Sequence, residues 1–261
     1  MDKSKPFAVT APNGKTHLLV MNATDGLPAA FALMGTRAAD KVAIRITGGC
    51  KGMSAEDKED MLAFFSEALR GYKGLIWSGA TRQVDKIGQI DPMVTEIPGL
   101  IASENPGCVA LGTLPRTDML SLQQDSRLVL DEWGTVPNPS LLGILIVQNG
   151  PEGKMDWDGD LDAYFRMMQN WQTYAGFGQL GLISWNGGPI TEKEIMRSIN
   201  LGWPTILIEG SGRVTDEIVA KVNGRDKEFI KQLPDVCNIW TIKKNDPADL
   251  GSALHDLKFI N

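Results

Sequence analysis

Histidine is scarce in this sequence: its 261 residues include only His17 and His255, near opposite ends of the chain. This distribution argues against a histidine-based catalytic centre and against a histidine-rich zinc site. Cysteine is also rare, because Cys50, Cys108 and Cys237 are far apart and form no CxxC pair. Such an odd number of separated cysteines is typical of reduced thiols in the cytosol. We therefore expect a cytoplasmic protein without a bound metal ion.

The sequence has no excess of basic residues and no long apolar run. Its 26 Lys and Arg residues against 32 Asp and Glu residues give a net charge of −6. This balance cannot neutralise the phosphates along a duplex, although it permits a local basic cluster around one small anion. No apolar run reaches the ~18 residues of a membrane helix, and the N-terminal stretch lacks the apolar segment of a signal peptide. We expect neither a nucleic-acid partner nor a membrane contact; the sequence leaves open a homo-oligomer.

Short β-rich runs alternate with amphipathic stretches along most of the chain. At the N-terminus, Phe7–Thr10 and His17–Met21 flank the turn signal Pro12-Asn13-Gly14 and predict a β-hairpin. Ser54, with acidic residues and a periodic apolar stretch after it, predicts a capped helix. Repeated strand–glycine–helix units imply right-handed crossovers and a parallel sheet covered on both faces. The predicted fold class is α/β, a Rossmann-like three-layer sandwich with a mostly parallel sheet and an N-terminal β-hairpin.

The remaining elements follow from the same patterns. Two regions, Asp91–Asn105 and Pro115–Pro139, are the least regular, and each could form a lid or an elaboration on the sheet. A run of alternating aspartates from Asp156 to Asp162 lacks the downstream Glu of a calcium loop, so we expect a solvated loop before a helix. Strands are predicted at Val42–Thr47, Leu75–Trp77, Cys108–Leu111, Leu141–Val147, Leu180–Ser184 and Thr205–Ile208, and helices at Tyr164–Tyr174, from a Thr191 cap to Leu201, and on both sides of a last strand between Val214 and Leu257.

Five predicted strands end in glycine-rich turns, at Gly48–Met53, Ser78–Arg82, Gly112–Thr113, Asn186–Gly188 and Gly210–Arg213. The carboxyl ends of parallel strands face one crevice, so these turns should converge. Glycine lets the backbone approach a ligand closely, and the next helix N-terminus offers free N–H groups and a positive dipole end. Tight βα turns also need glycine for purely structural reasons. Convergence of five such turns favours a phosphate-binding site.

Basic residues inside these turns support an anionic ligand. Lys51, Arg82 and Arg213 each lie within a few residues of a glycine that ends a strand. The planar guanidinium of arginine suits bidentate contacts with phosphate. The alternative for each of them is an ordinary exposed surface charge.

Carboxylates and one tryptophan flank the same turns. Glu209 precedes the Gly-Ser-Gly turn, while Asp216 and Glu217 open the helix after it. A carboxylate there could bind a ribose diol or act as a general base, which makes Glu209 and Glu217 the candidate catalytic residues. Acids at a helix N-terminus also simply stabilise the helix dipole. Trp185 could stack on a base, with core packing as the alternative.

Three segments resemble a known family. Ile44–Met53 (IRITGGCKGM) and Leu75–Val84 (LIWSGATRQV) resemble the opening of the SLOG superfamily. Pro204–Ile218 (PTILIEGSGRVTDEI) is similar to the PVVxxDGSGRASD segment in the cytosolic N-terminal region of melastatin-type TRP channels. The resemblance covers roughly Lys41–Asn223. It implies one domain over residues 1–261, with a lead-in at 1–40, the family-like core at 41–223 and an extension at 224–261.

The resemblance also implies a Rossmann-like fold and, as in some channel domains, binding of ADP-ribose or a related nucleotide by a standalone prokaryotic relative. LONELY GUY-type phosphoribohydrolases of the same superfamily cleave an N-glycosidic bond with a PGGxGTxxE motif. The matching strand end here, Val147–Gly153, lacks the double glycine, the Thr and the correctly spaced Glu. By resemblance, the ligand-facing turns contain Gly48, Gly49, Ser78, Gly79, Ala80, Thr81, Gly210, Ser211, Gly212 and Arg213.

Residue patterns and resemblance together predict a sensor or ligand-binding protein for a small-molecule nucleotide such as ADP-ribose, and they identify no other cofactor. A nucleotide N-glycosidase or phosphoribohydrolase with a carboxylate near the same crevice is one alternative, and a structural module with an empty crevice is another. The predicted ligand-binding residues are Gly48, Gly49, Lys51, Ser78, Gly79, Ala80, Thr81, Arg82, Gly112, Thr113, Asn149, Gly150, Asn186, Gly187, Gly188, Glu209, Gly210, Ser211, Gly212 and Arg213.

Overall fold

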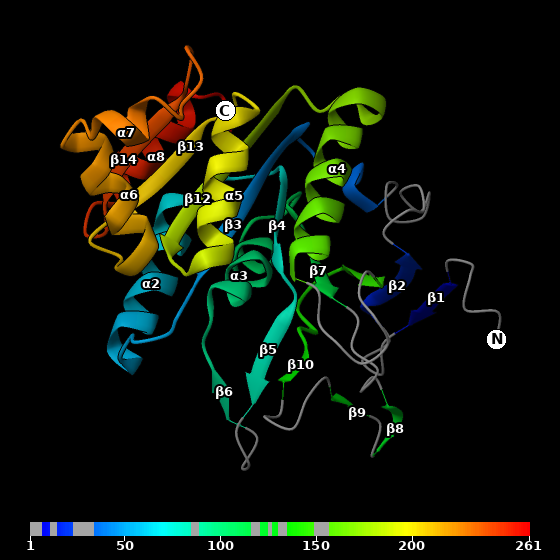
Figure 1. The fold of residues 1–261 in the computed structure, drawn as a ribbon. Coiled ribbons are helices and arrows are strands. Elements are labelled where there is room, and N and C mark those ends of the chain that lie inside the picture. The colour runs from blue at the N-terminus through cyan, green and yellow to red at the C-terminus, as the bar shows by residue number, and fades with distance from the viewer. Residues whose placement is uncertain are drawn as a thin grey trace.

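A mostly parallel β-sheet forms the centre of the computed structural model, which describes residues 7–10, 15–22, 34–84, 89–115, 121–124, 127–129, 135–148 and 157–261. Within these residues the sheet has nine strands in the order β1-β2-β11-β7-β4-β3-β12-β13-β14 (Figure 1). All neighbours from β2 to β14 pair in parallel, and only β1 is antiparallel. The strands are β1 (Phe7–Thr10), β2 (His17–Asn22), β3 (Val42–Gly49), β4 (Leu75–Gly79), β7 (Val109–Pro115), β11 (Gly143–Gln148), β12 (Gln179–Asn186), β13 (Thr205–Glu209) and β14 (Ile239–Lys243).

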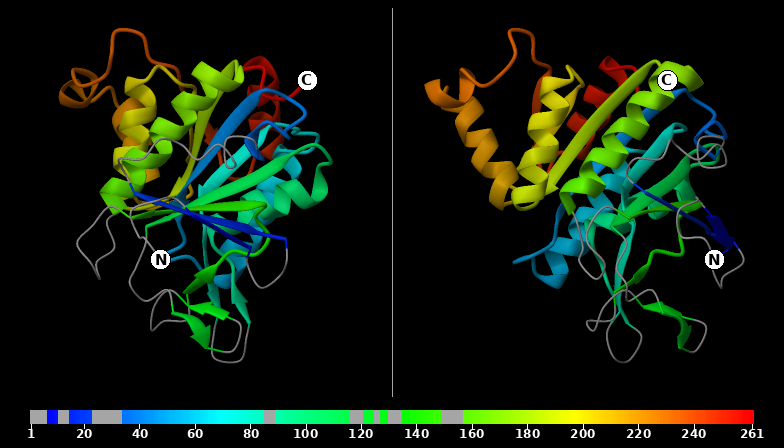
Figure 2. Two further views of the ribbon diagram at one scale, coloured as in Figure 1. Left: turned by 90° about the vertical axis from the view of Figure 1, so that its right-hand side faces the viewer. Right: turned by 45° about the vertical axis from the view of Figure 1, so that its right-hand side comes forward.

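Helices cover both faces of this sheet, as the two views in Figure 2 show. Each face of the sheet has its own apolar layer. Phe65, Ile97 and Leu250 belong to one layer, under what we call the first helical face, and Phe165 and Ile199 belong to the other, under the second. The first face carries α2 (Ala55–Ala68), α3 (Ile97–Glu104) and α8 (Pro247–Asp256), and the second carries α4 (Trp157–Ala175), α5 (Pro189–Asn200) and α6 (Arg213–Asn223), with the short α7 (Lys227–Ile230) after it. Burial on both faces explains why the strands are continuously apolar. The predicted three-layer α/β fold with its N-terminal hairpin pairing is confirmed.

The predicted cap at the start of α2 is also confirmed. The Ser54 hydroxyl accepts a hydrogen bond from the Asp57 N–H at 3.1 Å, and the Asp57 carboxylate accepts one from the Ser54 N–H at 3.2 Å. This reciprocal capping box satisfies two N–H groups that the first turn of the helix leaves without partners. It fixes the chain that leaves the first glycine turn.

Three predicted boundaries are wrong. Gly112 does not end a strand, because β7 continues to Pro115 with hydrogen bonds to both of its neighbours. Thr191 is not the cap of α5; the helix begins at Pro189, and the Thr191 hydroxyl accepts the Gly188 N–H at 3.4 Å. The aspartate run is not a loop from residue 157 onward, because α4 begins there. Side chains of this first part of α4 pair with α5, in the ion pairs Asp158–Lys193 and Asp162–Arg197.

Region Asp91–Asn105 is more regular than expected. It contains the 3₁₀ helix η1 (Val94–Glu96) and α3, with Ile97 and Ile101 fully buried. The residues before and after it form a small sheet of described strands, β10-β5-β6, that projects from the carboxyl edge of the main sheet (Figure 1). The added strands are β5 (Thr81–Val84), β6 (Ile90–Asp91) and β10 (Thr135–Pro137), and a separate pair is β8 (Ser121–Gln124) and β9 (Arg127–Val129).

Two further findings concern the described residues only. They include no helix with the length and apolar character needed to cross a membrane. They also include no cluster of three or more His, Cys, Asp or Glu side chains placed to hold a metal ion.

Candidate functional site

A cavity of about 240 Å³ opens where β3, β12 and β13 end. These strands are adjacent in the sheet, and therefore three of the predicted glycine turns meet there. Five predicted ligand residues line it, together with residues that the sequence did not single out. The lining consists of Lys51, Gly52, Met53, Asp57, Trp185, Asn186, Ser211, Gly212, Arg213 and Lys244.

Hydrogen bonds fix the turn after β13 to the end of β12. The Ser211 hydroxyl accepts the Asn186 N–H at 2.9 Å, and the Thr215 hydroxyl donates to the Asn186 carbonyl at 2.6 Å. Thr215 is fully buried and also bonds the Ser184 hydroxyl at 2.7 Å. The first turn of α6 is thus held rigidly at the cavity by side chains of the sequence Gly-Ser-Gly-Arg-Val-Thr-Asp.

Asp216 binds the backbone of the same turn. Its two carboxylate oxygens accept hydrogen bonds from the N–H groups of Gly210 at 2.7 Å and Gly212 at 3.0 Å. The Asp216 carboxylate therefore occupies the N–H groups of Gly210 and Gly212, which a ligand would otherwise contact. The next N–H groups, in the first turn of α6, have no intrahelical partners and carry the positive end of the helix dipole. An external anion at this cavity would meet those groups.

Two residues at the cavity have an unusual backbone conformation. Asn186 has φ 57° and Arg213 has φ 47°, in the left-handed region that side chains rarely adopt. The other described non-glycine residues of this kind, Arg225 and Lys258, directly follow the C-terminal caps of α6 and α8, where such a conformation is usual. Asn adopts this region more readily than most residues, but Arg213 at the start of α6 has no such explanation, and strained backbone of this kind is concentrated at functional sites.

The Arg213 guanidinium lies over Gly188. A Cβ atom at residue 188 would be 3.0 Å from the Nη2 of Arg213, so a side chain there would shift the guanidinium by a few tenths of an ångström. Arg213 forms no salt bridge with any described residue. Its five N–H donors can therefore contact a ligand.

Other predicted glycines of this half permit close packing, of Gly48 against the neighbouring strand and of Gly187 against the start of α5. A Cβ atom at Gly48, which has φ +144°, would lie 1.9 Å from the carbonyl oxygen of Trp185. At Gly187, with φ +97°, it would lie 2.4 Å from the Thr191 hydroxyl. Gly49 pairs with Asn186 at the end of the β3–β12 ladder. These glycines bring the two turns together without lining the cavity themselves.

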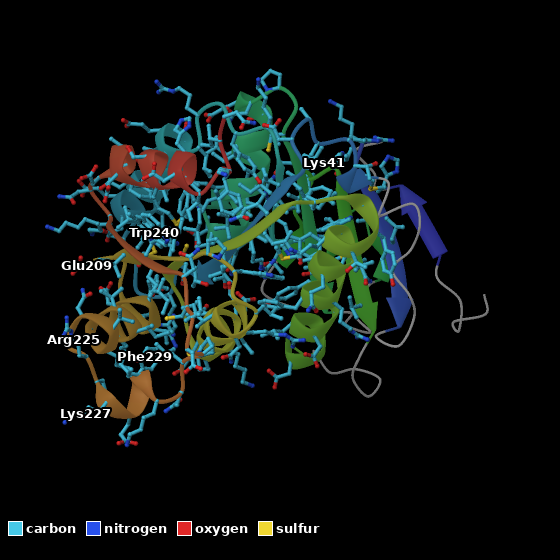
Figure 3. The ribbon with its side chains drawn as sticks, turned by 90° about the horizontal axis from the view of Figure 1, so that it is seen from above. Lys41, Glu209, Arg225, Lys227, Phe229 and Trp240 are labelled. Atoms are coloured by element: carbon cyan, nitrogen blue, oxygen red, sulfur yellow. The ribbon has the colours of Figure 1, made fainter. Side chains whose placement is uncertain are left out.

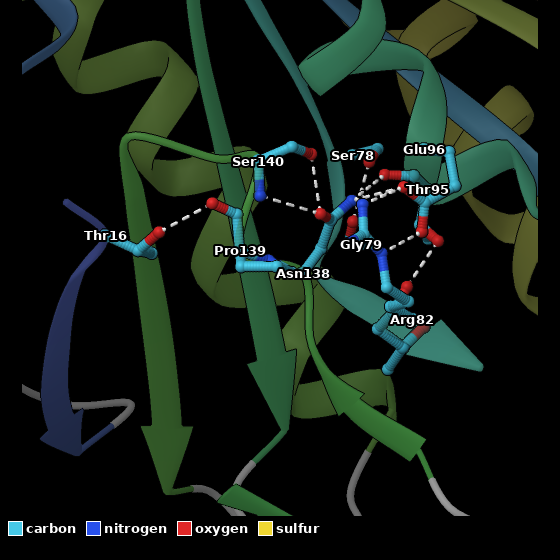
Figure 4. Close-up of polar contacts among 10 residues, drawn as sticks. Thr16, Ser78, Gly79, Arg82, Thr95, Glu96, Asn138, Pro139 and Ser140 are labelled. Atoms are coloured by element: carbon cyan, nitrogen blue, oxygen red, sulfur yellow. Dashed lines mark hydrogen bonds and ion pairs between the residues drawn. The ribbon is translucent and has the colours of Figure 1, made fainter. Parts of the chain in front are cut away.

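The turn after β4 has a different environment. Residues 78–82 do not line the cavity, because the chain passes directly from β4 into β5. Arg82 forms a two-point ion pair with Glu96, with Nε to Oε1 at 2.8 Å and Nη2 to Oε2 at 2.5 Å (Figure 4). Asn138 donates to the Thr95 carbonyl at 2.9 Å and to Glu96 at 3.3 Å, while Ser78 donates to the Gly79 carbonyl. Arg82 is thus bound within the protein.

Gly112 and Thr113 lie inside β7 and also outside the cavity. A Cβ atom at Gly112 would be 2.7 Å from both Ala80 and Leu141, so this glycine permits close packing. Thr113 is buried, and its carbonyl accepts the Ala80 N–H at 2.9 Å. The predicted ligand residues Asn149 and Gly150 lie outside the described residues.

Neither predicted catalytic carboxylate lines the cavity. Glu209 is half-buried at the end of β13, where it pairs in register with Lys243, and Glu217 is exposed on α6. Figure 3 shows Glu209 at the periphery, on the side of the molecule that carries Arg225 and Lys227. The carboxylate that does line the cavity is Asp57.

Lys244 and Asp57 are the lining residues that sequence reasoning missed. The Lys244 Nζ is 3.6 Å from an Asp57 oxygen, and both side chains are about half exposed. Hydrogen bonds from Ser54, and then the charge of Lys244, lower the pKa of Asp57 below its usual 3.8. Lys244 directly follows β14 and so lies on the same rim. The search for glycine turns missed it because β14 ends without glycine.

A buried ion pair lies in the interior of the second helical face. Arg45 in the middle of β3 bonds Glu194 of α5 at 3.0 Å, and its guanidinium lies 4.0 Å from the centre of the Tyr164 ring. Tyr164 donates a hydrogen bond to the same Glu194 oxygen. Burial raises the pKa of Glu194, and the charge of Arg45 opposes that shift. This group ties α4 and α5 to β3.

Comparison with known proteins gives one family match. The family described as "SLOG in TRPM, prokaryote" matches residues 144–248, which include the turns at Asn186 and at Gly210–Arg213. No curated protein matches the sequence.

Solved structures with a similar fold have low sequence identity to this chain. The X-ray structure of TM1055, a Northeast Structural Genomics Consortium target, is 19% identical with a TM-score of 0.48, over 81% of this chain and 98% of that one. The molybdenum cofactor carrier protein from Chlamydomonas reinhardtii is 13% identical with a TM-score of 0.45, over 83% and 97% of the chains. The molybdenum cofactor binding protein from Rippkaea orientalis is 13% identical with a TM-score of 0.41, over 82% and 96%. The family match over residues 144–248 supports membership of the SLOG superfamily.

Proposed function

We propose that this protein binds a nucleotide or nucleotide-derived signal of the ADP-ribose type, with the diphosphate in the cavity at the ends of β3, β12 and β13. The observation that carries the proposal is the concentration of positive charge there. Lys51, Arg213 and Lys244 line one small cavity in a chain whose net charge is −6. The N-terminal turn of α6 opens onto the same cavity and adds backbone donors.

The chemistry of these groups suits a phosphate more than other anions. Arg213 supplies a planar set of donors for bidentate contacts, and Lys51 supplies a mobile point charge. Asp57 is the only carboxylate among the lining residues, and Lys244 neutralises it. Asn186 is 2% exposed, and its Oδ1 has no donor among the described residues. That oxygen is suited to accept a hydrogen bond from a ribose hydroxyl.

We infer binding without turnover. An N-glycosidase needs a carboxylate over the ribose, and neither Glu209 nor Glu217 lines the cavity. Asp57 does, but its carboxylate oxygens are already bound by Ser54 and Lys244 of the protein itself. The structure therefore favours a sensor or ligand-binding role.

A thermal-shift screen followed by calorimetry tests this proposal. ADP-ribose, ADP and AMP should raise the melting temperature, because a ligand that binds only the folded state stabilises it, by about 2.7 kcal/mol at one hundred times Kd. Adenosine, which lacks phosphate, is the matched control and should give a much smaller shift. Chromatography of the same mixtures should show no free base. No shift with any phosphorylated compound would contradict the proposal, and release of base would support the enzyme instead.

A further inference from the structure

A second pocket of about 290 Å³ adjoins the first cavity. Three residues line both, namely Asp57, Trp185 and Lys244, so the two hollows are adjacent and are together called the groove. The second pocket lies between α2 and the start of α8. Its lining is Asp57, Asp60, Ala63, Phe64, Glu67, Trp185, Lys244, Asn245 and Pro247.

Trp185 is the aromatic wall common to both hollows. It is 3% exposed and packs on Phe64 and Phe65, with ring centres 5.4 and 5.6 Å away. The indole Nε1 has no acceptor among the described residues. A buried donor without a partner costs free energy, commonly about 1–3 kcal/mol, so an acceptor on a ligand bound beside Trp185 would stabilise the site.

The two hollows carry opposite charge. Lys51 and Arg213 line only the first cavity, whereas Asp60 and Glu67 line only the second. At the junction Lys244 and Asp57 are 3.6 Å apart. The groove is therefore complementary to a ligand with an anionic part and an aromatic part that bears N–H donors. A nucleotide with an amino-substituted base has both.

We propose that the second pocket receives the base of the nucleotide, so that an ADP-ribose-like ligand lies along the groove with its diphosphate at Lys51 and Arg213. The base lies against Trp185 and donates to the carboxylates of α2. Lys244 stands between the base and the diphosphate, where it contacts a phosphate while it neutralises Asp57. This assignment rests on the proposed function and adds the site that selects the base.

Filling the second pocket tests the assignment. Ala63 is exposed on α2 and lines only this pocket, so Ala63→Trp should block the base while leaving the fold intact. Calorimetry with ADP-ribose should show affinity at least about tenfold weaker, the scale of losing the stacking of one base. Affinity for inorganic pyrophosphate should not change. Ala220→Trp on the exposed face of α6 is the matched control and should leave both affinities unchanged.

A milder variant tests the carboxylates separately. Glu67→Gln should weaken ADP-ribose binding about threefold, the size of one hydrogen bond, while Glu59→Gln, exposed on the same helix outside the pocket, should have no effect. Unchanged ADP-ribose affinity in Ala63→Trp, or an equal loss of affinity for pyrophosphate, would overturn the assignment of the base to the second pocket. Neither result would affect the proposed function. Wild-type protein that binds pyrophosphate but not ADP-ribose would overturn this assignment and would leave of the proposed function only a diphosphate site. Wild-type protein that binds neither probe would overturn the proposed function and this inference with it.

Discussion

The two halves of the carboxyl edge of the sheet use the same sequence pattern for different purposes. At the ends of β3, β12 and β13, the turns meet at a cavity, and Arg213 has no ion-pair partner among the described residues. At the ends of β4 and in β7, the glycines pack against neighbours, and Arg82 is paired with Glu96. A glycine followed by an arginine after a strand is therefore insufficient evidence of a site. What distinguishes the halves is whether the protein itself supplies the counter-charge.

Arg82→Ala should produce the largest effect, and the effect should be on stability. The side chains of Arg82 and Glu96 are only 15% and 11% exposed, so the variant leaves a carboxylate mostly buried without its partner. We expect the free energy of unfolding to fall by about 3 kcal/mol, as for a broken buried ion pair. Urea denaturation measures the loss, and calorimetry with ADP-ribose should show unchanged affinity. Weaker ADP-ribose binding with an unchanged free energy of unfolding would show that Arg82 contacts the ligand, and the two halves would then not differ.

Arg213→Ala should give the reverse result. Loss of a charge-assisted contact should weaken ADP-ribose binding by ~1–3 kcal/mol. The free energy of unfolding should stay within about 0.5 kcal/mol of wild type, because the side chain is exposed and has no internal partner. The control is Arg225→Ala, which removes an exposed arginine that follows the end of α6. Normal ADP-ribose affinity in Arg213→Ala would count directly against the proposed role.

A pair of glycine substitutions sharpens the comparison. Gly112→Ala would place a methyl group 2.7 Å from Ala80 and Leu141, so we expect a stability loss of about 1–2 kcal/mol from overpacking. Gly188→Ala would instead press on the mobile end of Arg213 at 3.0 Å. Its expected effect is severalfold weaker ADP-ribose binding with little loss of stability. Similar stability losses in both variants would contradict this division.

The smallest expected effect concerns the cap of α2. Ser54 lowers the pKa of Asp57 in the folded protein. The pair therefore stabilises the fold at pH values above the pKa of Asp57 in the unfolded chain, near 3.8. This stabilisation is lost as the pH falls through the lower pKa that Asp57 has in the folded protein. Ser54→Ala should therefore cost about 1 kcal/mol at neutral pH and less in acid. Urea denaturation at several pH values checks this. A cost that does not depend on pH would show that Asp57 is not coupled to the cap.

Much of the fold could be predicted from the sequence, and the site only in part. Alternating strands, glycine turns and helices were sufficient to predict a parallel sheet, and the geometry of such sheets placed the turns on one rim. The pairing of Arg82 could not be predicted, because its partner Glu96 lies in a segment whose helical character was hidden by its short length. Lys244 was missed because its strand ends without glycine. Close packing, as at Gly48 against Trp185, is a property of the folded chain that local sequence does not reveal.

The most direct test of the account is a crystal structure of the protein with bound ADP-ribose. We predict that the diphosphate lies between Lys51 and the first turn of α6, in contact with Arg213, and that Arg82 keeps its pairing with Glu96. A diphosphate bound at the ends of β4 and β7, with Arg82 released from Glu96 to contact it, would contradict the central claim.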